Sequence, residues 1–593
     1  MAYRAPVNDI IFALRSAAGL DGLIESGVYD GLDLDTIEAV LNEAGRFAGE
    51  VLEPLNRCGD RQGSKFEDAT VLTPEGWGSA YKQFSEAGWS ALPCPEEFGG
   101  QGLPQVVSTA VCEFWNASNL AFGLCPLLTQ GAIDAIHIGG SEDLKARFLP
   151  RLVSGEWSGT MNLTEPQAGS DLALIKTRAV PQADGTYRIF GTKIFITYGD
   201  HEMTANIIHL VLARLPDAPE GTRGISLFLV PKRLVNEDGS LGARNDVVCA
   251  GLEEKLGIHA SPTCVMNFGE QDGAVGFLIG EENRGLATMF VMMNEARLAV
   301  GMQGVAIADR ATQRAVAYAN ERRQGRGLDS GDGPVAIVEH ADVRRMLVTM
   351  QAMTQAARAI CLVTAREGDL AERASDPEAR QRAGARAALL TPVAKAFSTD
   401  IGCEVASLGV QVHGGMGFVE ETGAAQYYRD ARILPIYEGT NGIQAIDLLT
   451  RKLPLDDGEV MRSYLQDLGQ IVKEVRETNR PEFGRMGERL GEALAALAET
   501  SLWIGEQLKS NPQAALAGAT TYLRLFGITA GGCYLASGAL LSLCDGKAAG
   551  HDRHIGMARF FAENIAVTAP GLAASVTAGA EALTSIPTER LSA

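Results

Sequence analysis

The sequence predicts a mostly helical protein of the α+β class, in which a small central β domain lies between helical regions. Apolar residues recur at three- and four-residue steps before about residue 158 and after about residue 286, which is the period of amphipathic helices. Between these positions the pattern changes to alternation and short apolar runs, which are typical of strands. The chain has 593 residues and 46% of them are hydrophobic, so several domains with separate cores are expected.

Four regions follow from these patterns. Residues 1–157 form the predicted N-terminal helical domain with an extension, where LDLDTIEAVLNEAGRFAGEVLEPLN places one apolar stripe on one helix face. Residues 158–285 form the β domain, with GTYRIFGTKIFITYG, IIHLVLARL and GISLFLVPK as strand candidates and Asp184-Gly185 as a hairpin signal. Residues 286–455 form a helical bundle, because their helical patterns are too apolar to stand alone.

The segment RKLPLDDGE marks the boundary to an extra C-terminal helical domain, residues 456–593. Within it, residues 525–544 carry no charge over about the length of a membrane span. This stretch is rich in Gly, Ala, Thr and Ser rather than in Leu and Ile. We therefore expect a helix buried in a bundle or a subunit contact, and no membrane span.

Charge and cysteine usage narrow the class of function. A net charge of −21 and a pI near 5.0 argue against a general nucleic-acid or anionic-membrane surface, but they allow a local basic pocket for an anionic ligand. The ten cysteines are spread singly, as free thiols of a reducing compartment would be. His551 and His554 have no companion set at ligand spacing, so no metal is predicted. The N-terminus shows no secretory signal pattern, which predicts a cytoplasmic protein.

One short stretch, PIYEGTNGIQA at residues 435–445, places Glu438 directly before a glycine in a turn-forming run. Taken alone, this glutamate would be predicted as a solvated loop residue. Six sequence motifs along the chain, one of which contains Glu438, change that interpretation. In order, the motifs are MNLTEPQAGSDLALIKTRA (161–179), GTKIFIT (191–197), KLGIHASPT (255–263), AYANERR (317–323), LGVQVHGGMGF (408–418) and IYEGTNGIQ (436–444).

With these motifs in this order, the chain resembles the flavin-dependent acyl-CoA dehydrogenases over roughly residues 40–452. The N-terminal extension and the helical tail place it near a large subgroup of that family. The subgroup includes enzymes that act on 3-methylmercaptopropionyl-CoA in dimethylsulfoniopropionate breakdown, and some long-chain bacterial enzymes. The opening MAYRAPVNDIIFAL favours the first. A straight-chain fatty acyl-CoA dehydrogenase of β-oxidation is the alternative.

The resemblance implies removal of a proton from the carbon α to a thioester and of a hydride from the β carbon, giving a trans-2-enoyl-CoA. Glu438 matches the family's general base, and Gly439 lets the backbone approach the substrate. Some relatives carry the base on the long bundle helix, where this chain has Ala296. The neighbouring Glu295 is interpreted as an ordinary helix-face carboxylate.

The resemblance also implies FAD as cofactor and assigns residues to it. Phe195 stands where a tryptophan is usual, and Gln324 where a threonine is typical. The FAD residues implied are Met161, Leu163, Thr164, Ser170, Phe195, Thr197, Arg322, Gln324, Gln411, Gly414, Gly415, Thr440 and Asn441. The substrate residues implied are Ser170, Asn294, Arg297 and Gly439, with no metal ligand.

The partners implied are an acyl-CoA, an electron-transferring flavoprotein as electron acceptor, and further copies of the chain in a homodimer or a dimer of dimers. Two other functions stay open at this point. An acyl-CoA oxidase would use the same residues but let oxygen reach the reduced flavin. A non-catalytic flavoprotein could bind nucleic acid through its tail, but the tail has 12 Lys and Arg against 16 Asp and Glu, a balance of −4.

Overall fold

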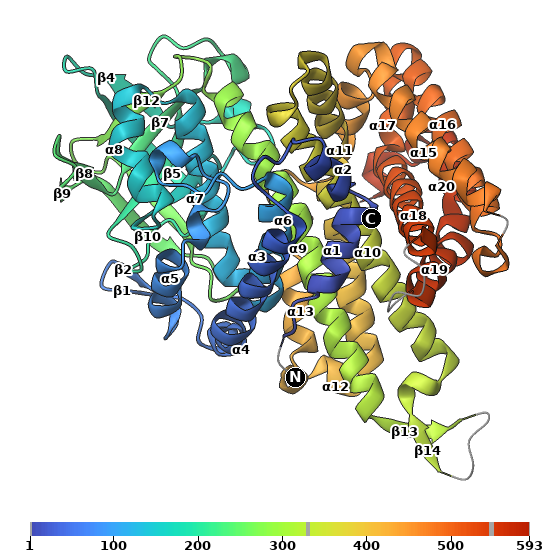
Figure 1. Ribbon diagram of the computed structural model, residues 1–593. Helices are drawn as coiled ribbons and strands as arrows, with labels where there is room; N and C mark the ends of the chain where they lie inside the picture. Colours follow the sequence, from blue (N-terminus) through green and yellow to red (C-terminus); the bar gives the residue numbers. More distant parts are fainter. Residues whose placement is uncertain (1–2, 328–332, 479, 545–550, 592–593) are drawn as a thin grey trace.

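The computed structural model describes residues 3–327, 333–478, 480–544 and 551–591, and its architecture is the predicted one (Figure 1). A β domain lies at one side of the molecule, long helices fill the middle, and a separate group of helices from the C-terminal part lies at the other side. The N-terminal helices are α1 (Val7–Ser16), α2 (Leu20–Glu25), α3 (Leu34–Phe47), α4 (Glu53–Gln62), α5 (Trp77–Glu86), α6 (Gln105–Ser118), α7 (Leu120–Gly139) and α8 (Glu142–Val153). A short hairpin, β1 (Lys65–Glu67) and β2 (Thr70–Leu72), interrupts them, which the sequence pattern did not predict.

The β domain is built on an eight-stranded sheet with the order β10-β11-β5-β12-β7-β6-β3, with β4 paired to β5. Only β3 and β6 pair in parallel; the other pairs in this sheet are antiparallel. Asp184-Gly185 does connect a hairpin, β4–β5, as predicted. The strands are β3 (Trp157–Asn162), β4 (Arg178–Pro181), β5 (Tyr187–Thr197), β6 (Asn206–Ala213), β7 (Ser226–Pro231), β10 (Val247–Leu252), β11 (Thr263–Phe268) and β12 (Ala274–Ile279), with a side hairpin of β8 (Arg233–Val235) and β9 (Leu241–Arg244).

Long helices carry the rest of the chain. The bundle contains α9 (Gly285–Glu321), α10 (Ala341–Arg373), α11 (Pro377–His413), α12 (Gly415–Phe418), α13 (Ala424–Ala431) and α14 (Asn441–Asp447), and a hairpin of β13 (Arg323–Arg326) and β14 (Pro334–Ala336). The C-terminal group contains α15 (Glu459–Glu477), α16 (Met486–Ser510), α17 (Pro512–Ala517), α18 (Ala519–Cys544), α19 (His551–Phe560), α20 (Ala569–Thr577) and α21 (Glu581–Thr584).

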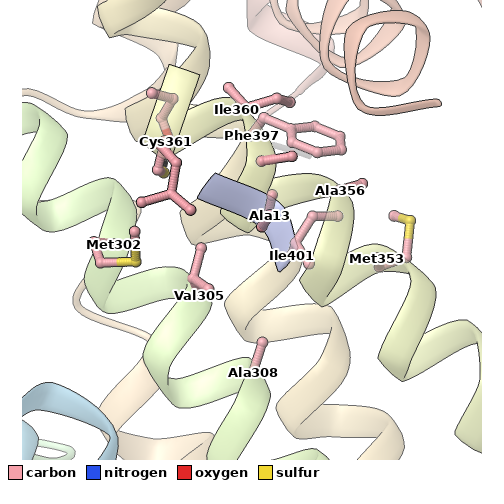
Figure 2. Close-up of a cluster of buried hydrophobic side chains, with 14 of the residues drawn as sticks. Ala13, Met302, Val305, Ala308, Met353, Ala356, Ile360, Cys361, Phe397 and Ile401 are labelled. Atoms are coloured by element: carbon pink, nitrogen blue, oxygen red, sulfur yellow. Dashed lines mark hydrogen bonds between the residues drawn. The ribbon is translucent and has the colours of Figure 1, made fainter. Parts of the chain in front are cut away.

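The main hydrophobic core lies where α9, α10 and α11 meet. Figure 2 shows part of it, with Met302 and Val305 from α9, Ile360 from α10, Phe397 from α11 and Ala13 from the N-terminal α1. These helices are apolar on most sides, as expected of helices surrounded by protein. The N-terminal and C-terminal helices therefore add to the same core rather than forming independent ones.

Glycines set how closely α9 and α11 approach. A methyl group on Gly301 would lie 2.6 Å from the Ala394 carbonyl oxygen, and one on Gly304 would lie 2.3 Å from that of Ser398. From the other side, a methyl group on Gly402 would lie 2.9 Å from the Gly304 carbonyl oxygen. Backbone meets backbone at this crossing, so larger side chains cannot be accommodated without moving a helix.

A buried ion pair ties this core to the N-terminal helices. Arg358 of α10 donates from Nε and from its terminal nitrogen to the Glu113 carboxylate of α6, at 2.8 and 2.5 Å. It also reaches Asp309 of α9 at 3.2 Å. Arg358 and Glu113 are both fully buried, so their bidentate geometry has to offset a large desolvation cost.

Three helices, α7, α10 and α18, are long and apolar enough to cross a membrane by length and composition. Their most apolar windows are 67%, 78% and 78% buried inside the protein. The uncharged stretch at residues 525–544 belongs to α18, which packs against α10 and α16, as a buried bundle helix was expected to do. His554 stacks on Phe12 with ring centroids 3.6 Å apart, and the side chain of His551 lies outside the described part of the structure.

We expect Gly304→Ala to reduce the free energy of unfolding by about 1–3 kcal/mol, because the added methyl group must separate α9 from α11. Urea or thermal unfolding measures this. Gly505 of α16 is the matched control, since a methyl group there meets nothing within 4 Å. Gly505→Ala should raise stability, by up to about 1 kcal/mol, through helix propensity alone. Equal effects of the two changes would show that the crossing is not tightly packed.

Candidate active site

Glu438 lies in a turn between α13 and α14 whose backbone is held from both ends. The Asn441 N–H donates to the Pro435 carbonyl oxygen at 3.0 Å, and the Thr440 hydroxyl caps α14 by accepting from the Ile443 N–H at 3.3 Å. Between these bonds, Glu438 and Gly439 both have positive φ, +52° and +88°. This conformation is strained for glutamate and costs roughly 1–2 kcal/mol. The surrounding structure therefore imposes the position of the Glu438 side chain.

Two buried cations face the Glu438 carboxylate. Arg297 comes from α9 and Lys395 from α11, and both are almost completely buried. Burial raises the pKa of Glu438 above its ordinary value, while the charges of Arg297 and Lys395 lower it. In the described part of the chain, the Glu438 side chain takes part in none of the hydrogen bonds, so its oxygens are free to meet a ligand.

The residues beside Glu438 are fastened to the bundle. The Tyr437 hydroxyl donates to Gln303 Oε1 of α9, and Gln303 Nε2 donates to Asn116 Oδ1 of α6 at 3.1 Å. On the other side, Asn441 accepts from Lys395 at 2.8 Å and donates to Asp400 at 2.7 Å. The predicted FAD contact of Asn441 remains untested, and its side chain is engaged in the fold.

Gln303, Lys395 and Gln444 were missed by the sequence analysis. Gln444 is fully buried beside Gly439, and within the described residues neither atom of its side-chain amide has a hydrogen-bond partner. Lys395 could have been found, because a single lysine in the apolar run TPVAKAF must lie in a core or beside a partner. Gln303 and Gln444 carry no such signal.

Of the predicted substrate residues, Asn294, Arg297 and Gly439 come together. Arg297 donates to Asn294 Oδ1 at 3.4 Å, and a methyl group on Gly439 would lie 3.7 Å from an Arg297 nitrogen. Ser170 is exposed in the loop after β3, away from these bonds.

The FAD residues predicted on the β domain also come together. The Ile194 N–H of β5 donates to the Thr164 carbonyl oxygen at 3.0 Å, which joins the loop after β3 to the strand that carries Phe195 and Thr197. Met161 of β3 lies in the same buried cluster as Ala296 of α9. The β domain site and the start of the bundle helix are therefore adjoining parts of one region.

Glu165 and Lys193 fasten this loop. Lys193 Nζ donates to Glu165 at 2.8 Å and to the Leu163 carbonyl oxygen at 3.0 Å, and both side chains are buried. Glu165 also accepts from the N–H groups of Lys176 and Thr177. Burial alone would raise the pKa of Glu165, but Lys193 and the donated hydrogen bonds lower it to about 2. The stability this provides is present above the ordinary carboxyl pKa and is lost as the pH falls toward 2.

The remaining FAD residues lie at the far end of the bundle. Arg322 follows α9 and Gln324 lies on β13. Gln411 lies in the last turn of α11, the exposed Gly414 follows that helix, and the exposed Gly415 begins α12 (Figure 1). The two helix ends meet through stacking of Tyr318 on His413, with ring centroids 4.4 Å apart. Along α9, this end is about 37 Å from Arg297 at 1.5 Å per residue, so the two groups of predicted residues lie near opposite ends of the helix.

Glu295 points away from Glu438. Its carboxyl group interacts with Asp134 of α7, and burial together with this neighbour raises the pKa of Glu295 well above its ordinary value. Gln130 donates to Asp134 at 2.8 Å. Glu295 is therefore not the ordinary helix-face carboxylate that the sequence analysis expected, because it forms a carboxyl pair with Asp134. Among the described residues, no group of three or more His, Cys, Asp or Glu side chains is arranged to hold a metal ion.

Comparisons with known proteins assign the family. Models of the acyl-CoA dehydrogenase N-terminal, middle and C-terminal domains match residues 34–156, 160–270 and 283–453, and an acetyl-CoA dehydrogenase C-terminal-like model matches 466–587. The chain is 51% identical to 3-methylmercaptopropionyl-CoA dehydrogenase of Ruegeria pomeroyi, over 91% of each chain. It is 35% identical to a butyryl-CoA dehydrogenase of Syntrophomonas wolfei, over 95% of each. The crystal structure of an acyl-CoA dehydrogenase from Bacillus anthracis complexed with FAD superposes with a TM-score of 0.74 at 21% identity, covering 92% of this chain and 89% of that one.

The chain belongs to the acyl-CoA dehydrogenase family, and it is an FAD-dependent oxidoreductase. The structure offers a surface that fits such a cofactor. Phe195 is 57% exposed and has a positive φ of +61°, so the fold holds an aromatic ring out toward solvent in a conformation that bulky residues rarely adopt. An apolar ring held in this way is suited to cover a flat ligand, as a flavin ring is.

We expect Lys193→Met to reduce FAD retention, because it leaves the Glu165 carboxylate buried without its cation and frees the loop that carries Leu163 and Thr164. Loss of one partner of a buried pair costs about 3–5 kcal/mol. Flavin absorbance per mole of purified protein and thermal unfolding measure the two effects. Lys176→Met, in the same loop but with an exposed side chain, should change neither. Full flavin content in the Lys193 variant would refute the proposed fastening.

Proposed function

We propose that Glu438 is the general base of an acyl-CoA α,β-dehydrogenation. The observation that supports this assignment most directly is the geometry of the turn. The backbone of Glu438 is strained, and its partly buried carboxylate faces two buried cations. Within the described structure this carboxylate makes no hydrogen bond. A general base of this kind contributes about 10²- to 10⁴-fold to a rate. The α proton moves to a Glu438 oxygen as the hydride leaves the β carbon.

The chain also supplies a group to polarise the thioester carbonyl. The Glu438 N–H takes part in no backbone hydrogen bond among the described residues, so it is available to a carbonyl oxygen on which negative charge develops. Because Gly439 has no side chain, a substrate carbonyl can approach the Glu438 N–H without obstruction from that residue. Asn294 and Arg297 stay proposed substrate residues, because they lie beside Gly439 and the charge of Arg297 acts on the Glu438 carboxylate.

FAD, when bound, accepts the hydride. We assign the flavin ring to the β domain surface around Phe195, with Ser170 between cofactor and substrate. The residues that would hold it there are Met161, Leu163, Thr164, Ser170, Phe195 and Thr197, with Thr440 and Asn441 from the turn. As the family resemblance implies, the FAD of a neighbouring subunit would be held by Arg322, Gln324, Gln411, Gly414 and Gly415, which lie at the far end of the bundle. A homodimer or a dimer of dimers follows from this assignment.

The proposed substrate is 3-methylmercaptopropionyl-CoA, on the 51% identity over 91% of both chains to the Ruegeria pomeroyi enzyme of that name. A straight-chain acyl-CoA is the second candidate, favoured by the 35% identity to a butyryl-CoA dehydrogenase over 95% of both chains. We further propose an electron-transferring flavoprotein as the electron acceptor and a cytoplasmic location. The tail's charge balance of −4 does not favour nucleic acid as a partner.

We expect Glu438→Gln to keep FAD and the fold but to lose at least about 10²-fold in dehydrogenation, since an amide cannot take the proton. Steady-state rates with a dye acceptor, alongside flavin content, measure this. Glu295→Gln is the matched control and should stay near the wild-type rate, because Glu295 faces Asp134. Retention of most activity in the Glu438 variant would refute the assignment of the base.

Anaerobic mixing with three thioesters separates the substrate candidates. We expect 3-methylmercaptopropionyl-CoA to bleach the flavin absorption band faster than butanoyl-CoA or palmitoyl-CoA. Faster bleaching by a straight chain would assign the protein to fatty-acid oxidation instead. Repeating the reaction in air adds a further test, because hydrogen peroxide formed in equal amount to the enoyl-CoA would identify an acyl-CoA oxidase.

A further inference from the structure

Lys395 is a buried cation directly behind the turn that carries Glu438. It lies in the middle of α11, is fully buried, and donates to the Leu434 carbonyl oxygen at 2.9 Å and to Asn441 Oδ1 at 2.8 Å. These two acceptors stand before and after Glu438 in the sequence, so one ammonium group joins the two ends of the turn. A fully buried lysine is costly to the fold, and such groups are retained where they have partners.

The same contacts leave Lys395 close to the carboxylate without a direct bond to it. No hydrogen bond joins Lys395 to Glu438 within the described structure, yet each charge acts on the other. An ammonium group in this position favours the ionised carboxylate while leaving its oxygens free for a proton.

We propose that Lys395 is a positioning residue for Glu438, which fixes the turn through its two hydrogen bonds and holds the carboxylate in the ionised form that can accept a proton. This inference rests on the proposed role of Glu438 as base. Lys395 lies outside the motif IYEGTNGIQ and precedes it by about forty residues.

The charged groups around the pair determine the direction of the pH effect. Lys395 is faced by Glu438 from the turn, by Asp400 and Cys403 from α11 and by Arg297 from α9, while Glu438 is faced by Arg297 and Lys395. Burial lowers the pKa of Lys395 to about 7, against the charges of Glu438 and Asp400. Lys395 therefore carries its proton below about pH 7, and in that range its charge opposes protonation of Glu438.

The test is the pH profile of kcat/KM, whose acidic limb reports the base of the free enzyme. Lys395→Gln removes the charge but keeps an amide donor for the turn, and Lys395→Met removes both. With the cation gone, the pKa of Glu438 rises, so the acidic limb should move up by about one pH unit or more. At a pH below the limb this is about a tenfold loss of kcat/KM, and the rates of the Gln variant and the wild type should converge at high pH.

Asp400→Asn tests the same idea without replacing Lys395 itself. In the wild type, Asn441 Nδ2 donates to Asp400 at 2.7 Å. The Asn side chain of the variant keeps an oxygen for this hydrogen bond but removes the negative charge that faces Lys395. Because the Asp400 charge helps to keep Lys395 protonated, its removal should again move the acidic limb to higher pH, and this variant decides the outcome if both Lys395 variants fail to fold. Lys145→Met is the control and should leave the limb in place, because Lys145 lies on α8 and pairs with the exposed Glu142 at 2.9 Å.

Two outcomes separate this inference from the proposed function. If Glu438→Gln removes the acidic limb but neither Lys395→Gln nor Asp400→Asn moves it, Glu438 is the base and Lys395 does not set its charge, so the inference is wrong. If the Lys395→Gln variant folds and contains FAD but loses kcat/KM equally at every pH, Lys395 has only a structural role and the inference is wrong as well. If Glu438→Gln leaves the limb unchanged, the proposed function itself fails.

Discussion

The close crossing of α9 and α11 is the constraint on which the site depends. Gly301, Gly304 and Gly402 let the two helix backbones come into contact. This contact brings side chains of α9 and α11 next to the turn that contains Glu438. Arg297 lies one turn before Gly301 on α9, and Lys395 lies between the residues that those glycines contact on α11. The turn that contains Glu438 rests on both helices through Tyr437 and Asn441. Helix separation therefore determines how far each cation lies from the carboxylate.

That arrangement combines two requirements that normally oppose each other: a site that excludes water and a carboxylate that stays ionised. A general base works best in a pocket that excludes water, but burial favours the protonated form, which cannot take a proton. The fold places Arg297 and Lys395 behind Glu438, where they oppose the effect of burial. Their own desolvation is offset by Asp447 for Arg297, and by Asn441 and the Leu434 carbonyl oxygen for Lys395. The side of the carboxylate that must meet the substrate carries no such partner.

Much of the architecture could be predicted because its signals are local. The change from helical to strand periodicity and the Asp184-Gly185 turn each depend on a few neighbouring residues, and the order of the domains follows from them. The short hairpins β1–β2 and β13–β14 were missed, since three- or four-residue strands contain too little pattern. The site divides in the same way. Glu438 was predicted because the family resemblance assigns a role to its short motif, whereas Lys395 and Gln303 become partners of that turn only through helix packing.

Helix geometry also favours the proposed base in the turn over one on α9. Successive residues of a helix differ by about 100°, so Glu295 lies about 200° around the axis from Arg297 and faces Asp134 of α7. Ala296 lies between them and is buried with Met161 in the cluster beneath the β domain. A small side chain there leaves no carboxylate to compete with Glu438 for the α proton, and like charges would raise the pKa of both. One carboxylate in the turn, with the cations of two helices behind it, avoids that repulsion.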